Sequence, residues 1–222
     1  MSSTSNEHID SIASVYNDKL ALEVIENLKN RRMTGYYSPT IEEARKKTMS
    51  LIPKGSVVTQ GGSMTLEQTG IRQALLDTKD ISFIDPYSTE ISRAEQLDRR
   101  KKAFSADVFI CSTNALTRDG ILVNRDGIGN RVCAMAYGPE KVIIVCGINK
   151  IVLDVAAAID RIDTVAAPKN CIRLNRNTPC RTSPECPDCN SNERICSVLT
   201  IIDWQVSVDR IHIVIVGHPL GF

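Results

Sequence analysis

The chain has 222 residues, of which 42% are hydrophobic and 5% aromatic, so it can form one large α/β domain with a full core. Its 27 Lys and Arg residues against 26 Asp and Glu leave a net charge of +1. No basic stripe alternates with aromatic residues, which excludes a typical nucleic-acid-binding surface. The longest uncharged apolar run, 211–217, is too short to cross a bilayer, and residues 1–10 lack the apolar core of a secretory signal. We therefore expect a cytoplasmic protein with no nucleic-acid or membrane partner.

The N-terminal part of the chain predicts two helices. Apolar residues recur at helical spacing over residues 8–32. A second helix begins after Thr40, which can form a capping box with Glu43. We expect both helices to pack on one face of a sheet, with residues 1–39 as a helical extension of a domain that spans residues 40–222.

A short strand over residues 56–59 runs directly into paired glycines and small hydroxyl residues. The residues that we predict to bind ligand in this loop are Gly61, Gly62, Ser63 and Thr65. Glycine lets backbone N–H groups approach an anion, although a plain tight turn explains the same pattern. The Gly-Lys-Ser/Thr ending of a Walker loop is absent, so no nucleotide cofactor is indicated.

The next segment predicts a strand over residues 80–85 and a charged helix over residues 88–106. This helix contains the basic run Asp98-Arg-Arg-Lys-Lys102. We interpret the run as a solvent-exposed helix face rather than as a phosphate-binding site.

The centre of the chain carries the densest set of polar side chains. Two apolar runs, 107–111 and 141–146, predict buried parallel strands, and an Asp-Gly turn at 119–120 predicts a β-hairpin between them. Ligands bind at the carboxyl ends of strands in open α/β sheets, so we predict a site here. Its expected members are Asn114, Asn124, Asp126, Gly127, Asn130 and Arg131. The alternative is that these side chains bond only their own turns.

The second of these strands is followed by another polar turn. It contains Asn149 and Lys150 and leads into a helix predicted over residues 152–162. We predict that Asn149 binds ligand and that Lys150 neutralises an anionic ligand. A surface lysine is the competing interpretation.

A cysteine-rich loop is predicted over residues 171–196. A loop of this length without regular structure needs a cross-link, and four thiolates suit tetrahedral zinc or an iron–sulfur cluster. The predicted ligands are Cys180, Cys186, Cys189 and Cys196, with Cys171 as a substitute. Their spacing matches neither a typical zinc site nor a ferredoxin, and free thiols or a redox-labile pair are the alternative. The remaining cysteines, Cys111, Cys133 and Cys146, are expected to be small buried apolar residues.

Several of these segments together resemble the LUD (lactate utilisation, formerly DUF162) domain family, in particular its stand-alone lactate utilisation proteins. The likeness covers about residue 40 to the end. It lies in GGSMTLEQTGI, in ADVFICSTNALTRDGILVNRDGIGNRVCAMAYGPEKVIIVCGINKIVLDVAAAIDRI and in IHIVIVGHPLGF. The insert PCRTSPECPDCNSNERIC resembles one found in a subset of these proteins.

The resemblance implies an α/β fold with an open, mainly parallel sheet and helices on both faces. This fold is shared with ribose-5-phosphate isomerase, glucosamine-6-phosphate deaminase and CoA transferases. The resemblance also implies a link to oxidation of L-lactate to pyruvate, with other lactate-utilisation proteins or further copies of the chain as partners. The Cys-x2-Cys-x2-Cys-x3-Cys-Pro motif of the electron-carrying subunit is missing, so redox activity is not implied.

Three functions are consistent with the sequence. The first is a component of lactate oxidation that binds a small anionic metabolite near a cysteine-bound centre. The second is an isomerase or ligase acting on a phosphorylated or carboxylated metabolite, with Asp126 or Glu67 as the general base and Lys150 or Arg131 holding the anion. The third is a non-enzymatic, metal-stabilised ligand-binding module.

Overall fold

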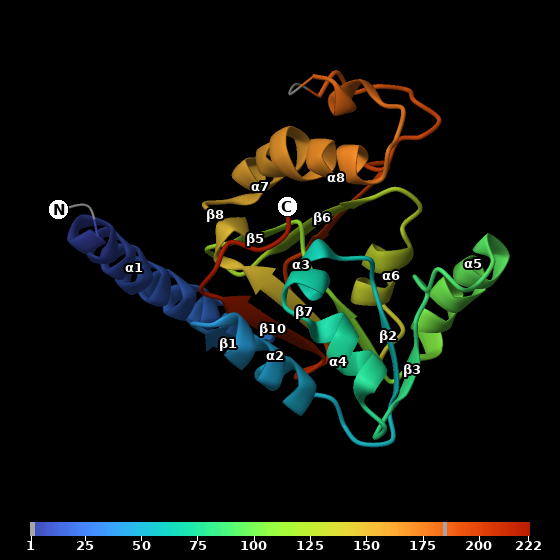
Figure 1. The fold of residues 1–222 in the computed structure, drawn as a ribbon, viewed down its shortest axis with the longest axis horizontal. Helices are drawn as coiled ribbons and strands as arrows, with labels where there is room; N and C mark the ends of the chain where they lie inside the picture. Colours follow the sequence, from blue (N-terminus) through green and yellow to red (C-terminus); the bar gives the residue numbers. More distant parts are fainter. Residues whose placement is uncertain (1–2, 184–185) are drawn as a thin grey trace.

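The computed structural model describes residues 3–183 and 186–222 and is built around a six-stranded parallel sheet (Figure 1). Every neighbouring pair of strands in this sheet runs parallel. In spatial order the strands are β1 (Thr34–Ser38), β10 (Ile211–Val216), β7 (Lys141–Gly147), β4 (Val108–Cys111), β2 (Val57–Gln60) and β3 (Ser82–Ile84). The predicted α/β class, an open and mainly parallel sheet with helices on both faces, is confirmed.

The central strands are apolar nearly throughout because both faces of the sheet are covered. Every residue of β4 and β10 is buried, and so is every residue of β7 after Lys141. This is the pattern expected of parallel strands between two helical layers. The two strands predicted at 107–111 and 141–146 pair directly, with Ile110 opposite Ile143.

The two N-terminal helices cover opposite faces of the sheet, so the prediction of one helical layer was wrong. On β10, Ile213 and Ile215 belong to the core cluster that contains α1 (Ser3–Asn30). Val214 and Val216 belong to the cluster that contains α2 (Ile41–Ser50) and α4 (Ile71–Asp77). Successive side chains of a strand point to opposite faces of the sheet, which is why neighbouring residues of β10 contact different helices. The chain passes from one face to the other between α1 and α2.

Strand β1 was not predicted and explains this crossing. It lies between α1 and α2 at the sheet edge, where Tyr36 pairs with Val214. Four of its five residues are only partly buried, so it lacks the apolar signature of a central strand. The helix that follows starts as predicted, because the Thr40 hydroxyl accepts a hydrogen bond from the Glu43 N–H at 3.2 Å.

A second, smaller sheet carries the predicted hairpin. Its order is β8 (Ile151–Val152), β5 (Ala115–Thr117), β6 (Leu122–Asp126) and β9 (Val198–Ile202). Strands β5 and β6 are antiparallel, which confirms the hairpin, and β9 adds antiparallel to β6. Helices α7 (Val155–Arg161) and α8 (Ala167–Arg173), joined by a π-helical turn, Ile162–Ala166, lie over this sheet (Figure 1).

The remaining elements are short. They are α3 (Met64–Gln68), α5 (Arg93–Lys101), α6 (Asn130–Ala136) and the 3₁₀ turns Lys102–Ser105, Ile148–Lys150 and Pro179–Arg181. Cys171 belongs to α8, so the cysteine-rich segment begins inside a helix rather than in a loop. No helix in the described part of the chain is both long and apolar enough to span a bilayer.

Candidate functional site

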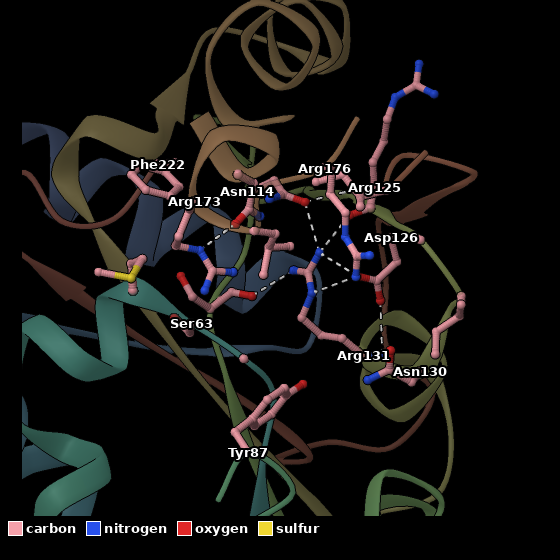
Figure 2. A pocket seen from close by; sticks show the side chains of 18 of the residues that line it. Ser63, Tyr87, Asn114, Arg125, Asp126, Asn130, Arg131, Arg173, Arg176 and Phe222 are labelled. Carbon is pink, nitrogen blue, oxygen red and sulfur yellow. Dashed lines mark hydrogen bonds and ion pairs between the residues drawn. The ribbon is translucent and has the colours of Figure 1, made fainter. Parts of the chain in front are cut away.

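A cavity of about 740 Å³ lies where the loops that follow β2, β4, β6 and β7 converge. Its walls come from the glycine-rich loop at 62–65, the segment 112–114 after β4 and the loop 125–131 after β6. Segments 170–176 and 192–195, from α8 and the cysteine-rich loop, form another side, and Tyr87, residues 93–100 and residues 221–222 complete the lining. Figure 2 shows side chains from these separate segments pointing toward one another. The loops therefore meet at the carboxyl ends of the strands, as predicted.

Most of the predicted site residues share this cavity, including the pair formed by Ser63 and Asn130. The predicted residues that line it are Gly62, Ser63, Thr65, Asn114, Asp126, Gly127, Asn130, Arg131 and Lys150. The cavity therefore brings together predicted residues from segments that are far apart along the chain.

Lys150 is the most unusual of these residues, because it is a buried cation with neutral partners. It ends the 3₁₀ turn after β7 and is only 3% exposed. Its ammonium group donates to Thr65 Oγ1 at 3.1 Å, Ser112 Oγ at 2.9 Å and the Thr113 carbonyl at 3.1 Å. Within the described residues no carboxylate lies within salt-bridge distance. Burial lowers the pKa of Lys150 to about 8. Neutral oxygens use all three of its N–H donors, so an anionic ligand would supply the missing opposite charge by displacing one of them, such as the Thr65 hydroxyl.

Arg131 is held by the protein through every N–H of its guanidinium group. Nη1 donates to the Ser112 carbonyl at 2.9 Å and to Asn124 Oδ1 at 2.7 Å. Nη2 donates to Asn114 Oδ1 and the Arg125 carbonyl, while Nε and Nη2 both lie 3.4 Å from Asp126 Oδ1 (Figure 2). An arginine has five N–H donors, so none remains for a ligand. Arg131 therefore contributes charge and braces the loops.

The Asp126 carboxylate is likewise engaged by the protein. Besides Arg131, its Oδ2 accepts hydrogen bonds from the backbone N–H groups of Arg131 at 3.0 Å and Val132 at 3.1 Å. These bonds hold the start of α6. The same carboxylate that was predicted as a general base thus positions a helix and a guanidinium group.

Four predicted residues lie outside the cavity lining. Gly61 packs beneath the loop, where an added Cβ would come within 3.2 Å of the Cys111 Cβ. Asn124 is fully buried behind Arg131, and Asn149 accepts a hydrogen bond from the Leu220 N–H at 2.9 Å. Glu67 is exposed on α3 and lies 3.7 Å from Arg72.

The cavity lining is rich in basic side chains, although the whole chain has a net charge of only +1. Two acidic side chains, Asp126 and Glu193, line it, and Asp163 and Asp188 pair with Arg125 and Arg194 from outside the lining. The basic residues that line it are Arg93, Arg100, Arg125, Arg131, Lys150, Arg173, Arg176 and Arg194. An excess of positive charge inside a concave, partly desolvated site favours an anionic ligand.

Several of these arginines are fixed in place without a carboxylate partner among the described residues. Arg173 donates from Nε to Asn170 Oδ1 at 2.9 Å, and burial lowers the pKa of its guanidinium group. Arg100 lies over the Tyr87 ring, 5.0 Å from its centroid, as in a cation–π contact. Arg100 belongs to the basic run that was interpreted as a solvent-exposed face, so that interpretation was incomplete.

The arginines from the C-terminal half of the cavity wall were not predicted. Arg173 ends α8 and Arg176 follows it, while Arg194 lies in the loop that precedes β9, which pairs with β6. Their sequence neighbourhood shows cysteines and turn residues without any anion-binding pattern. The one sequence feature of this segment that fits such a role is its four basic residues, at positions 173, 176, 181 and 194.

The cysteines separate into groups that differ from those expected. Cys111 and Cys146 are buried as predicted, and burial raises the pKa values of their thiols to about 12 and about 11. Cys133 is exposed on α6, so its predicted burial was wrong. In α6 the buried residues are Val132, Ala134 and Met135, which turns position 133 outward.

In the cysteine-rich segment the structure brings Cys171 and Cys180 together, with 3.6 Å between their sulfur atoms. Cys186 is exposed, and Cys189 and Cys196 are partly buried. Across residues 3–183 and 186–222, no three His, Cys, Asp or Glu side chains are already assembled as a set of metal ligands. The predicted four-cysteine centre remains a prediction.

Comparison with known proteins gives one family and one similar fold. The family model described as LUD domain matches residues 21–216. The crystal structure of a DUF162 family protein from Deinococcus radiodurans has a TM-score of 0.53 at 12% identity, covering 90% of this chain and 98% of that chain. No curated protein matches the sequence.

Two further solved structures are similar over part of the chain. Ribose 5-phosphate isomerase A from Neisseria gonorrhoeae has a TM-score of 0.35 and 15% identity, covering 53% of this chain and 56% of that chain. The eIF2B delta subunit from Chaetomium thermophilum has a TM-score of 0.35 and 18% identity, covering 60% and 54%. Similarities of this size carry no argument about this site.

Proposed function

This chain belongs to the LUD domain family, and we propose that it binds an anionic small metabolite in the basic cavity, with Lys150 against the anionic group of the ligand. The observation that carries the proposal is the buried ammonium group of Lys150, which has three neutral hydrogen-bond partners and no carboxylate counter-ion among the described residues. A buried charge is costly unless it is paired, so a protein that retains one at a cavity wall gains most when a ligand pairs it.

The size of the cavity bears on the class of ligand. About 740 Å³ falls within the roughly 300–1,000 Å³ of pockets that enclose drug-sized molecules. A three-carbon hydroxy acid such as L-lactate leaves most of this volume to water. The proposal therefore favours a larger phosphorylated or carboxylated metabolite, and the link to lactate oxidation rests on the family resemblance alone.

The chemistry that this arrangement supports is stabilisation of negative charge on an oxygen atom. A preorganised ammonium group in a low-dielectric site stabilises an oxyanion or enolate without reorganising during the reaction. Lys150 supplies this group, and the Ser112 and Thr65 hydroxyls hold its position. Proton transfer on a substrate carbon next to a carbonyl group is the reaction class that such a site serves best.

A ligand screen by thermal shift tests the proposal. The panel contains sugar phosphates, dicarboxylates, hydroxy acids including L-lactate, and inorganic phosphate. Wild-type protein is expected to be stabilised by phosphorylated or multiply carboxylated compounds more than by L-lactate. Stabilisation should disappear in K150M and persist in K54M, because Lys54 is a surface residue paired with Asp80 at 3.2 Å. Absence of stabilisation by every compound, with wild-type protein folded, would contradict the proposal.

A further inference from the structure

The cysteine-rich segment forms one wall of the cavity but has little regular structure of its own. Between the 3₁₀ turn Pro179–Arg181 and β9, no helix or strand is present in the described residues. A few polar contacts tie the segment together. The Asn177 N–H donates to Glu193 Oε2 at 2.8 Å, Ser191 Oγ donates to the Asn177 carbonyl at 2.9 Å, and Arg194 Nη1 donates to the Cys189 carbonyl at 2.8 Å. A loop of this length and composition in a compact protein calls for a cross-link.

The Cys171 and Cys180 sulfur atoms have the separation of two thiolates on one metal ion. They lie 3.6 Å apart, far beyond the roughly 2.05 Å of a disulfide bond. Two thiolates bound tetrahedrally to one zinc ion at about 2.3 Å lie about 3.8 Å from each other. In a four-iron cluster each thiolate binds a different iron atom, which holds the sulfurs farther apart. The observed pair therefore fits a mononuclear site.

The fold holds Cys171 and Cys180, two of the four ligands that such a site needs, in fixed positions. Cys171 is 1% exposed and sits in α8, and Cys180 lies in the 3₁₀ turn, with its sulfur 3.4 Å from the Thr178 hydroxyl.

We propose that Cys171 and Cys180 are the fixed half of a structural zinc site. The other two ligands come from Cys186, Cys189 and Cys196, which the loop brings to the pair when zinc binds. The helix residue Cys171 is thus an obligatory ligand rather than a substitute. Zinc favours deprotonated thiolates, so binding releases the thiol protons to solvent without any redox step.

A zinc site at this position would also affect the neighbouring cavity. The segment that zinc would tie to α8 carries Arg176, Glu193 and Arg194, all of which line the cavity. Zinc binding then holds these side chains over the ligand site. This role is separate from the proposed metabolite binding, because zinc content and the fold of the loop are measured without any metabolite.

Metal analysis of full-length protein tests the proposal. Protein produced with added zinc should contain about one zinc per chain and no iron or acid-labile sulfide. Cobalt substitution should give the intense absorption of tetrahedral cobalt–thiolate bonds. C171S and C180S should each bind zinc at least roughly 100-fold more weakly, beyond the 10–100-fold loss typical of changes behind the ligands.

The matched control is C133S, which removes an exposed cysteine from α6 outside the loop. It should keep full zinc content. C180S lies in a partly exposed turn, so it tests the site even if C171S disturbs α8. Stoichiometric iron and sulfide, wild-type protein that binds no zinc, or a folded C171S that keeps wild-type zinc affinity would each overturn the proposal.

Discussion

The ammonium nitrogen of Lys150 lies 2.9 Å from the hydroxyl oxygen of Ser112, at the meeting point of the turns that follow β7 and β4. The contact joins the ends of two adjacent parallel strands through a buried charge. A protein designed only for stability would fill this position with an apolar side chain, since burying a charge is unfavourable. This unpaired charge is the basis of the proposed ligand site.

Replacing Lys150 should strongly weaken ligand binding. K150M removes the ammonium group but keeps a long apolar side chain, so the cavity wall is retained. We expect affinity for an anionic ligand to fall at least roughly 100-fold, as for a buried charge-assisted hydrogen bond worth about 3 kcal/mol. Isothermal titration calorimetry with the best compound of the screen measures this loss. K54M should bind like wild type, and equal affinity of K150M and wild type would refute the role of Lys150.

Anion binding should also weaken at high pH. Burial lowers the pKa of Lys150 to about 8, so the free protein loses this charge as the pH rises above 8. An anion binds the protonated form, and its apparent affinity should fall by up to about tenfold per pH unit above that point. Titrations between pH 7 and pH 9.5 show this decline if Lys150 pairs the ligand. The residual affinity of K150M should not share it.

The same lowered pKa predicts the opposite trend for the stability of the ligand-free protein. Between about pH 8 and the ordinary lysine value of 10.5, the unfolded state binds the Lys150 proton and the folded state does not. The unfolding free energy therefore gains up to about 1.4 kcal/mol per pH unit across this window from Lys150. Urea unfolding should show wild type gaining stability relative to K150M as the pH rises from 8 toward 10. A constant difference between the two would mean that Lys150 titrates normally.

Arg131 should matter for folding more than for specific ligand contacts. R131M removes the guanidinium donor of the Ser112 and Arg125 carbonyls and of Asn114 Oδ1, and it leaves the Asp126 carboxylate without its cationic partner. Breaking a buried ion pair on one side costs about 3–5 kcal/mol, and we expect a loss in that range. Chemical denaturation measures it. R45M, which removes an exposed guanidinium group 3.5 Å from Glu42, should lie within about 0.5 kcal/mol of wild type.

Gly221 offers a way to disturb Lys150 without changing it. Its φ is +61°, and an added Cβ would lie 2.5 Å from Thr65 Oγ1 and 3.1 Å from Lys150 Nζ. G221A should therefore lower stability by about 1 kcal/mol or more and displace the ammonium group, which weakens ligand binding. G55A is the matched control, because Gly55 has a φ of +79° with nothing within 4 Å of an added Cβ. G55A should lose stability but keep wild-type affinity; equal ligand affinity of the two variants would contradict this account.

Local sequence signals predicted the central part of the site because each one has a local physical cause. The Asp-Gly turn determined the hairpin, the apolar runs determined β4 and β7, and the ends of these elements brought Asn114 and Lys150 together. Glu67 was assigned to the site from its place after the glycine pair. Helix α3 instead buries Thr65 and Leu66 and turns the next residue outward.

The features that were missed depend on contacts between distant segments. Strand β1 has a mixed burial pattern and forms only because β10 offers an edge. Arg173 and Arg176 line the cavity from the end of α8, and Arg194 lines it from the loop before β9, which pairs with β6; no local pattern predicts these positions. The covering of opposite sheet faces by α1 and α2 likewise follows from the position of β1. These features depend on which strands pair across the sheet, and composition and hydrophobic periodicity do not specify that pairing.

A structure of the protein with the most stabilising compound of the screen bound tests the central claim most directly. We predict an anionic group of that compound within hydrogen-bond distance of Lys150 Nζ, with the rest of the molecule extending toward Arg173 and Arg176. A compound bound elsewhere, with the ammonium group still held only by Ser112, Thr65 and Thr113, would contradict the assignment of this cavity as the functional site.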